Sequence, residues 1–326
     1  MDTGNCDART EGMSYGMMMC VMLDKKNYFE RMWKFSHDFM YMGESAMKGY
    51  FAWSVAPDGK KNAFGPAPDG EEFFAMALFL ADRKWGSGEG IYNYKEWAKK
   101  ILRTCIHGDI PMWTADNHLI RFTPMSPFTD PSYHLMHFYH YFAEWADECD
   151  RPFWKEAEKE SRAYLVKSAD PKTGMHPEYA DFEGKANHEN HFPGIDPMFA
   201  DHGCFFSDAY RTAANIGLDA LWFGKNPELT KICDNLVNFF ADIEPENYMK
   251  YEIDGTPTEF KALHPIGLLA TLAQATLSCS ENSKPACEKI IRRFWNTKPR
   301  RGERRYYDNC LYMFAVLALS GKYKVE

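Results

Sequence analysis

The sequence predicts an all-α protein built from helical hairpins that close into a ring. Eleven runs of the 326-residue chain show the 3.6-residue periodicity of helices, and glycine- and proline-rich loops separate them. Six of these runs are rich in small, apolar and aromatic residues, five are amphipathic, and the two kinds alternate. Because an all-apolar helix is buried and a one-faced helix covers it, we expect a toroid of six buried and five covering helices.

The elements follow one another as repeated hairpins, each a covering run and then a buried run. The first buried run, 11–23, stands alone at the start of the chain. The later pairs are 25–41 with 69–83, 93–107 with 131–146, 151–168 with 205–222, 226–242 with 263–278, and 283–296 with 305–319. The covering partner of the first run is missing, and we expect it upstream of Met1 in a longer relative.

The longer loops precede the buried runs, so they should gather on one face of the ring. A short strand-like piece, 49–54, precedes the run 69–83, and the segment 181–203 carries several histidines and prolines. No stretch has the composition of a flexible interdomain linker. We therefore predict that residues 1–326 form one catalytic domain.

Composition and charge exclude several classes of protein. The net charge of −8 argues against a nucleic-acid partner, because phosphates require a basic face. No apolar stretch reaches about 18 residues, which argues against a membrane-spanning helix. Nine cysteines are spread singly and no basic and apolar leader opens the chain, so we predict reduced thiols in a cytoplasmic protein. The oligomeric state stays open.

Three carboxylates stand at the starts of apolar helical runs. Glu11, Asp69 and Asp208 each sit among small and aromatic residues. Each has an ordinary structural explanation as well: Glu11 could favour a helix dipole, Asp69 could be an N-cap, and Asp208 could pair with Arg211 three residues on. Carboxylates gathered at one end of an apolar bundle cost desolvation energy, however, and paired carboxylates beside aromatic rings suit the acid–base cleavage of a sugar linkage.

Several motifs resemble glycoside hydrolase family 8 over the range 2–324. They are Arg9-Thr10-Glu11-Gly12-Met13-Ser14-Tyr15-Gly16, Ala67-Pro68-Asp69-Gly70-Glu71-Glu72-Phe73-Phe74, Asp130-Pro131-Ser132-Tyr133-His134, Leu263-His264-Pro265 and Arg304-Arg305-Tyr306-Tyr307-Asp308-Asn309. The second motif departs from the family signature at Pro68 and Glu71, and a narrower group that releases xylose from the reducing end of oligosaccharides shares both departures. The resemblance implies an (α/α)6 barrel, here without its first outer helix.

The resemblance also implies roles for individual residues. Glu11 would be the general acid, Asp208 the general base that activates water, and Asp69 would bind and distort the sugar. Tyr133 would help to hold the attacking water, and His264 would contact the reducing end. The segment 181–203 looks expanded relative to such enzymes.

The implied reaction is a single displacement with inversion. Two carboxyl groups about 6.5–9.5 Å apart leave room for water, whereas about 5–5.5 Å implies a covalent intermediate and retention. The predicted enzyme releases xylose from the reducing end of xylo-oligosaccharides. The alternatives are an endo-acting xylanase or β-glucanase of the same family, and a non-catalytic oligosaccharide-binding remnant. The remnant would show an exposed apolar stripe on the hairpin 11–41.

Aromatic and basic residues complete the predicted substrate site. The predicted substrate-binding residues are Tyr133, Trp53, His264, Arg211 and Tyr307. We place Trp53, Trp113, Tyr133, Tyr306 and Tyr307 on the open face of the ring, with core packing as the alternative for each of them.

Two histidine sets could suggest a metal. His134, His137 and His140 are three residues apart, and His188, His191, His202 and Cys204 cluster in one segment. Neither set has the ligand spacing of a zinc site. The consecutive methionines 17–19 point in different directions on a helix, which favours packing. We predict no metal and no cofactor.

Overall fold

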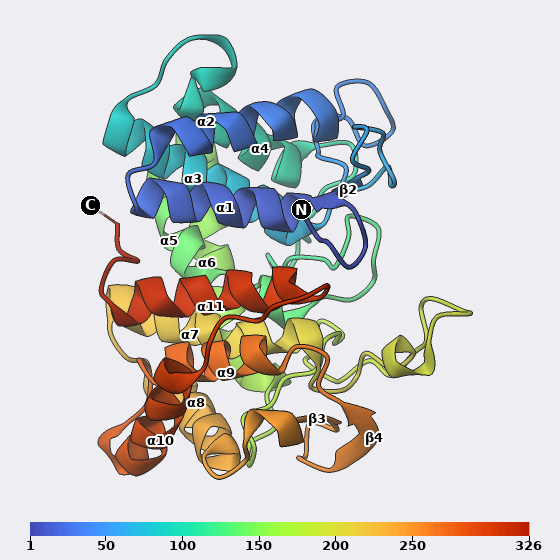
Figure 1. Ribbon diagram of the computed structural model, residues 1–326. Helices are drawn as coiled ribbons and strands as arrows, with labels where there is room; N and C mark the ends of the chain where they lie inside the picture. The colour runs from blue at the N-terminus through green and yellow to red at the C-terminus, as the bar shows by residue number, and fades with distance from the viewer. Residues whose placement is uncertain (326) are drawn as a thin grey trace.

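The structure, a computed structural model, describes residues 1–325 and contains eleven α-helices within them (Figure 1). The helices are α1 (Thr10–Met22), α2 (Lys26–Phe35), α3 (Pro68–Trp85), α4 (Tyr94–His107), α5 (Met136–Trp145), α6 (Arg151–Ser168), α7 (Tyr210–Phe223), α8 (Pro227–Phe240), α9 (Pro265–Ala275), α10 (Lys284–Asn296) and α11 (Arg305–Leu319). Each lies within or beside a predicted run, so the predicted mostly helical fold is confirmed. Short strands are β1 (Ala8–Arg9), β2 (Ser54–Val55), β3 (Met249–Tyr251) and β4 (Pro257–Lys261).

The odd-numbered helices form a closed inner ring. Each of α1, α3, α5, α7 and α9 contacts the next odd-numbered helix, and α11 contacts α1. The even-numbered helices lie outside (Figure 1). The predicted pairing of each covering run with the buried run after it is wrong: α2, α4 and α6 pack mainly on the inner helix before them, because the shorter connections follow the inner helices. The loops that carry β1 to β4 lie together at one end of the molecule. This arrangement places the first turns of the inner helices beneath those loops.

Two predicted runs begin differently from the expectation. The run predicted at 131–146 opens with a 3-10 turn, Pro131–Tyr133, before α5, and the run at 205–222 opens with another, Ser207–Ala209, before α7.

The N-cap interpretation of Asp69 is wrong. Pro68 occupies the first helical position of α3, so the cap falls on Ala67 and the Asp69 carboxylate is left for other partners.

The strand pair β1–β2 ties the start of α1 to the loop before α3. Its register is antiparallel and pairs Ala8 with Val55 and Arg9 with Ser54. The N–H of Thr10, the first residue of α1, donates to the carbonyl of Trp53 at 3.0 Å. The pairing therefore fixes the position of Glu11 relative to Trp53.

The starts of α1 and α3 approach closely because residue 70 is glycine. A Cβ added to Gly70 would lie 2.5 Å from Cβ and Oγ1 of Thr10. Contacts that short are excluded by van der Waals repulsion, so a larger residue would push the two helices apart. The Asp69-Gly70 pair thus brings the first turns of two inner helices together.

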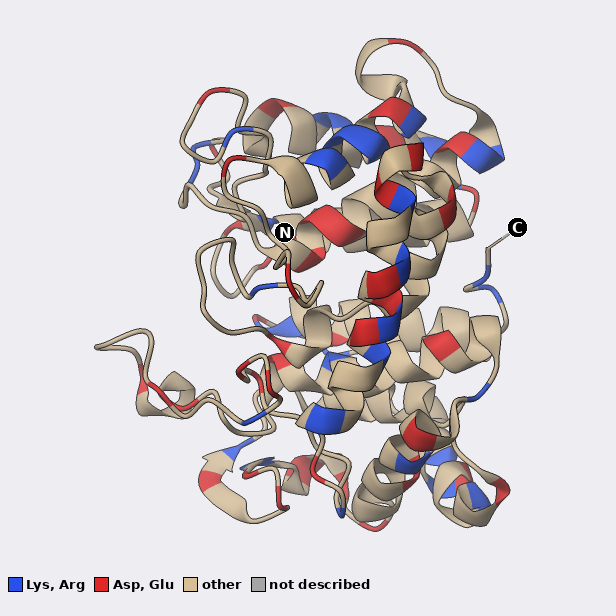
Figure 2. Cartoon of the chain, turned by 180° about the vertical axis from the view of Figure 1, so that it is seen from behind, with Lys and Arg blue, Asp and Glu red and all other residues tan. Residues whose placement is uncertain are grey.

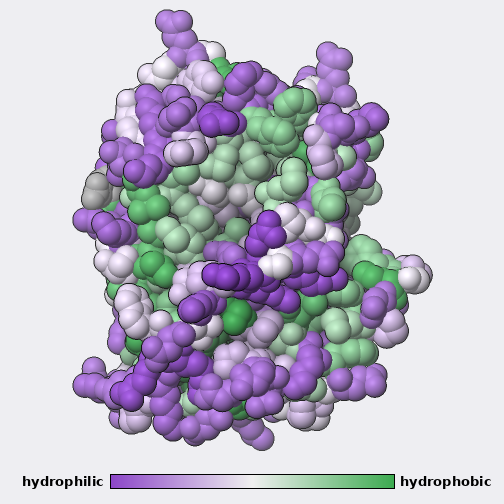
Figure 3. Space-filling view, viewed as in Figure 1, coloured by the Kyte–Doolittle hydropathy of each residue, from purple (hydrophilic) through white to green (hydrophobic). Residues whose placement is uncertain are grey.

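Helix α2 packs on α1, but no outer helix within residues 1–325 covers the seam between α11 and α1. Figure 3 shows a largely hydrophobic surface over α1 in the view of Figure 1. Half-buried apolar residues of the two helices are Met13, Met19 and Cys20 on α1 and Cys310 and Met313 on α11. These residues are half-buried, so the exposed apolar stripe expected on the hairpin 11–41 of a remnant stays a prediction.

Replacing Gly70→Ala should lower the free energy of unfolding by about 1–3 kcal/mol, because the added methyl group overpacks the α1–α3 contact. The matched control is Gly65→Ala, since a Cβ at Gly65 would meet nothing within 4 Å. That variant should stay within about 0.5 kcal/mol of the parent in urea denaturation. Equal stability of the two variants would contradict the close approach.

Candidate active site

The three predicted carboxylates converge on one guanidinium. Glu11 lies in the first turn of α1, Asp69 in the first turn of α3, and Asp208 in the 3-10 turn before α7. Nη1 of Arg211 donates to Oε2 of Glu11 and to Oδ2 of Asp69, both at 2.8 Å. Nη2 of Arg211 lies 3.4 Å from Oδ1 of Asp208. The two carboxyl groups of Glu11 and Asp208 therefore lie within the span of a single side chain.

Arg211 is itself buried and is surrounded on all sides. Its Nη2 lies 3.5 Å from Oδ2 of Asp130, and its Nη1 donates to the hydroxyl of Tyr15 at 3.2 Å. The rings of Tyr133 and Tyr307 lie 5.3 Å and 5.9 Å from its Cζ atom. A buried cation requires such compensation, because desolvation alone would oppose its burial.

Glu11 is placed to hold a proton at neutral pH. Burial raises its pKa to about 7, the nearby charges of Asp69 and Asp208 raise it as well, and the Arg211 charge opposes them. The hydroxyl of Tyr306 on α11 donates to Oε1 at 2.7 Å. A Cβ at Gly12 would lie 2.6 Å from the Tyr306 ring, so the glycine after Glu11 leaves room for this contact.

Asp69 and Asp208 differ in their access to solvent. The Asp69 side chain is 6% exposed, and burial raises its pKa. The Asp208 side chain is 36% exposed, against 14% for Glu11. Of the three carboxylates, Asp208 is therefore the one that solvent reaches most easily, as an acceptor of a proton from water requires.

Two pockets meet at Glu11, Asp208 and Arg9. We call the first the Trp53 pocket, of about 310 Å³; its other lining residues are Thr10, Trp53, Pro66, Ala67, Asp69, Phe122, Thr123, Tyr133, Phe192 and Arg211. We call the second the His264 pocket, of about 340 Å³; its other lining residues are Asp2, Gly4, Asn5, Glu178, Phe199, His202, Ser207, Leu263, His264, Arg304, Tyr306 and Tyr307. Glu11 and Asp208 thus line both pockets, which together we call the cleft.

All eight predicted site residues line this cleft. Glu11 and Asp208 border both pockets; Asp69, Trp53, Tyr133 and Arg211 border the Trp53 pocket, and His264 and Tyr307 border the His264 pocket. The placement of Trp113 on the open face is wrong: it is 2% exposed and packs edge-on against Tyr139 and Trp154 in the core.

Sequence reasoning missed four residues at the site. Asp130 stood inside a quoted motif without a role, and Tyr306 was given a place on the open face without a partner. Glu178 and His202, which line the His264 pocket, were not singled out as site residues. Both lie in the irregular stretch between α6 and α7, where no helical or strand periodicity indicates which side chains face inward.

The histidines considered as metal ligands go to different partners. His188 contacts Asp201, His191 contacts Asn187, and His202 contacts Glu178. In the other set, His134 contacts Thr129 and Ser161, and His140 contacts Glu158. Neither set converges on one point among the described residues.

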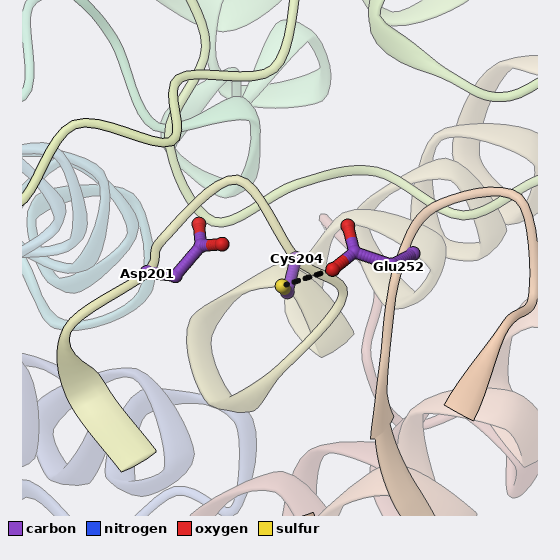
Figure 4. Close-up of side chains that lie close together, drawn as sticks. All are labelled: Asp201, Cys204 and Glu252. Atoms are coloured by element: carbon purple, nitrogen blue, oxygen red, sulfur yellow. Dashed lines mark hydrogen bonds between the residues drawn. The ribbon is translucent and has the colours of Figure 1, made fainter. Parts of the chain in front are cut away.

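A different trio does gather nearby. The ligand atoms of Asp201, Cys204 and Glu252 lie within 4.8 Å of one another (Figure 4). The Cys204 thiol donates to Glu252 at 3.7 Å, and burial raises the pKa of this thiol. A protonated, hydrogen-bonded thiol is a poor metal ligand. The absence of a resident metal stays a prediction.

Charged residues of both signs are distributed along the chain (Figure 2). Figure 2 shows Lys and Arg interspersed with Asp and Glu along the chain seen from behind. Among the described residues, no helix has the length and apolar character needed to cross a bilayer. All nine cysteines are unpaired within residues 1–325.

Comparison with known proteins identifies the family. The family model described as glycosyl hydrolases family 8 matches residues 1–321. The chain belongs to this family.

This family 8 chain is similar over its full length to characterised members. It is 53% identical to a reducing end xylose-releasing exo-oligoxylanase of Halalkalibacterium halodurans, covering 100% of this chain and 82% of that one. It is 50% identical to Rex8A of Paenibacillus barcinonensis, described with the same activity, and covers 84% of it. A solved variant of a reducing-end-xylose releasing exo-oligoxylanase complexed with xylobiose superposes with a TM-score of 0.95 at 52% identity, covering 100% of this chain and 85% of that one.

The raised pKa of Glu11 predicts a pH dependence of stability. Folding raises this pKa from 4.5 to about 7, so the protonated carboxyl favours the folded state fully below pH 4.5, and the contribution is lost as the pH rises through about 7. The unfolding free energy of the parent minus that of Glu11→Gln should therefore fall across this window. Urea denaturation at several pH values measures it, and a difference that stays flat between pH 4.5 and 7 would show that Glu11 titrates normally.

Proposed function

We propose that the protein is an inverting glycosidase that releases xylose from the reducing end of xylo-oligosaccharides. The observation that carries this proposal is the pairing of Glu11 with Asp208 across Arg211, at the junction of two pockets. Support comes from the full-length similarity to enzymes named for that activity and to one complexed with xylobiose. We propose no cofactor, because two carboxyl groups suffice for this chemistry.

In the proposed mechanism Glu11 is the general acid. Its buried carboxyl keeps a proton up to about pH 7 and can donate it to the glycosidic oxygen as the bond breaks. Arg211 and Tyr306 hold the carboxyl and favour the carboxylate left behind after donation.

Asp208 is the proposed general base. Its carboxylate reaches the solvent side of the cleft, where it would take a proton from the attacking water. Tyr133, whose ring lies 5.3 Å from Cζ of Arg211, would help to orient that water, and Asp69 would bind and distort the sugar in the same pocket. We propose that a water fits between the two carboxyl groups, which implies inversion of the anomeric centre.

The two pockets divide the substrate at the scissile bond. Trp53 is 37% exposed in the Trp53 pocket and offers a ring face for a sugar on the non-reducing side. In the other pocket, Nδ1 of His264 lies 2.8 Å from Asp308, which Arg300 also contacts at 2.7 Å. The Tyr307 ring packs against the imidazole at an interplanar angle of 59°. We propose that this fixed imidazole contacts the terminal xylose and limits the pocket to one sugar.

We further propose that the fold is a single-domain (α/α)6 barrel whose outer position over the α11–α1 seam is unfilled within residues 1–325. The closed inner ring supports this proposal. The apolar surface over α1 is the feature that a non-catalytic remnant would show. The assembled carboxyl cluster favours the enzyme, since a remnant has no need to retain buried carboxylates.

Glu11→Gln and Asp208→Asn should each lower kcat on xylotriose by about 10²–10⁴-fold, because each removes a proton transfer from the transition state. The matched controls are Glu281→Gln and Asp242→Asn, whose side chains are 90% and 81% exposed. Chromatography of released xylose gives the rates, and NMR of the first-formed anomer gives the stereochemistry. Near-parental rates in either site variant would remove that residue from the mechanism.

Xylotriose reduced at its end should resist hydrolysis, whereas an endo-acting enzyme would cleave both forms. His264→Ala should lower the ratio of kcat/KM for xylotriose to kcat/KM for reduced xylotriose, because the contact with the terminal sugar is lost. His107→Ala is the control, since His107 is also paired with an aspartate, Asp150, but lies on an outer helix. Equal rates on the two substrates in the parent would favour the endo-acting alternative.

A further inference from the structure

The peptide group that leads into Asp208 is clamped from both sides. Its carbonyl, that of Ser207, accepts a hydrogen bond from the hydroxyl of Tyr307 at 3.1 Å. Its N–H, that of Asp208, donates to Oε1 of Glu178 at 3.3 Å. Two side chains from distant parts of the chain therefore fix the orientation of one peptide plane.

The backbone at this point is strained. Ser207 has a φ angle of +28°, in the left-handed region that residues with a Cβ rarely adopt. Such a conformation costs of order 1–3 kcal/mol and persists only where the surroundings over-determine it. The hydrogen bonds from Tyr307 and to Glu178 hold the Ser207–Asp208 peptide in this conformation.

Glu178 is held in turn by His202. Nδ1 of His202 lies 2.9 Å from Oε2 of Glu178, and the two side chains are 10% and 5% exposed. The imidazole stacks on Tyr179 with ring centroids 4.2 Å apart. Lys250 donates to the carbonyls of Met198 and Asp201, which anchors the backbone just before His202.

The burial of Glu178 has no other explanation in the proposed mechanism. Glu178 as a whole is 4% exposed. Burial raises the pKa of its carboxyl, and the charge of Asp208 raises it further. A buried carboxyl beside a second carboxylate destabilises the fold unless its hydrogen bonds are needed. Both of its oxygens are used, one on Asp208 and one on His202.

We propose that Glu178, oriented by His202, is a positioning residue that holds the strained Ser207–Asp208 peptide, so that the Asp208 carboxylate faces the attacking water. The proposal rests on the assignment of Asp208 as the general base. It assigns a function to two residues of the irregular stretch between α6 and α7 that line the His264 pocket.

Loss of the clamp should impair the base without impairing the acid. Glu178→Ala should lower kcat on xylotriose by about 10²-fold with little change in KM, since an ångström-scale misplacement of a catalytic group costs about that much. Glu178→Gln should recover most of the rate, because its amide oxygen still accepts the N–H of Asp208. A rescue by glutamine separates the hydrogen bond from the charge.

A second substrate identifies which half of the reaction fails. β-Xylobiosyl fluoride carries a leaving group that needs no proton, so Glu11→Gln should retain activity on it while Asp208→Asn loses activity on both substrates. Glu178→Ala should follow the Asp208 pattern. A defect confined to xylotriose, or parental kcat in Glu178→Ala, would overturn the positioning proposal.

A second variant tests the clamp if Glu178→Ala does not fold, and Asp208→Asn tests the base assignment itself. If Glu178→Ala does not fold, His202→Phe preserves the stack on Tyr179 and removes only the contact to Glu178; it should lower kcat on both substrates, and an unchanged kcat would overturn the proposal. If Asp208→Asn is fully active on both substrates, the base assignment itself fails. That result is distinguishable from a failure of the clamp, in which Asp208→Asn is inactive and Glu178→Ala is not impaired.

Discussion

The arrangement of the site depends on one buried cation. Arg211 contacts Glu11, Asp69, Asp130 and Asp208, which come from four separate parts of the chain. Without the guanidinium, the low-dielectric interior would make four close carboxylates repel one another. Without the carboxylates, the guanidinium could not be buried. The ring therefore closes around a charge cluster whose two halves require each other.

The carboxyl groups of this cluster differ in burial and in access to solvent. Burial of Glu11 favours its protonated form, whereas its contacts with Arg211 and with Tyr306 of α11 oppose that effect. Asp208 stands on a short turn at the cleft and reaches solvent. Environments that differ in this way give two chemically similar groups different tasks, one as proton donor and one as proton acceptor.

Helix α11, which closes the inner ring against α1, carries two tyrosines that contact the site. Tyr306 and Tyr307 are adjacent in the first turn of α11, yet one contacts Glu11 and the other contacts the peptide before Asp208. Helix α11 thus joins the acid side and the base side of the cleft. Its outward face lies beside the uncovered surface of α1, so packing at this seam supports both carboxyl groups.

The sequence alone determined the eleven helices, their alternation and the three carboxylates at helix starts, because periodicity and helix-start signals are local and extend over only a few turns. It could not determine the contacts of Arg211, which lies 200 residues from Glu11 and 142 from Asp69. Nor could it find Glu178 and His202, or show that Trp113 is buried while Trp53 is exposed. Those facts depend on how distant elements pack, since burial and electrostatic neighbours are properties of the assembled ring.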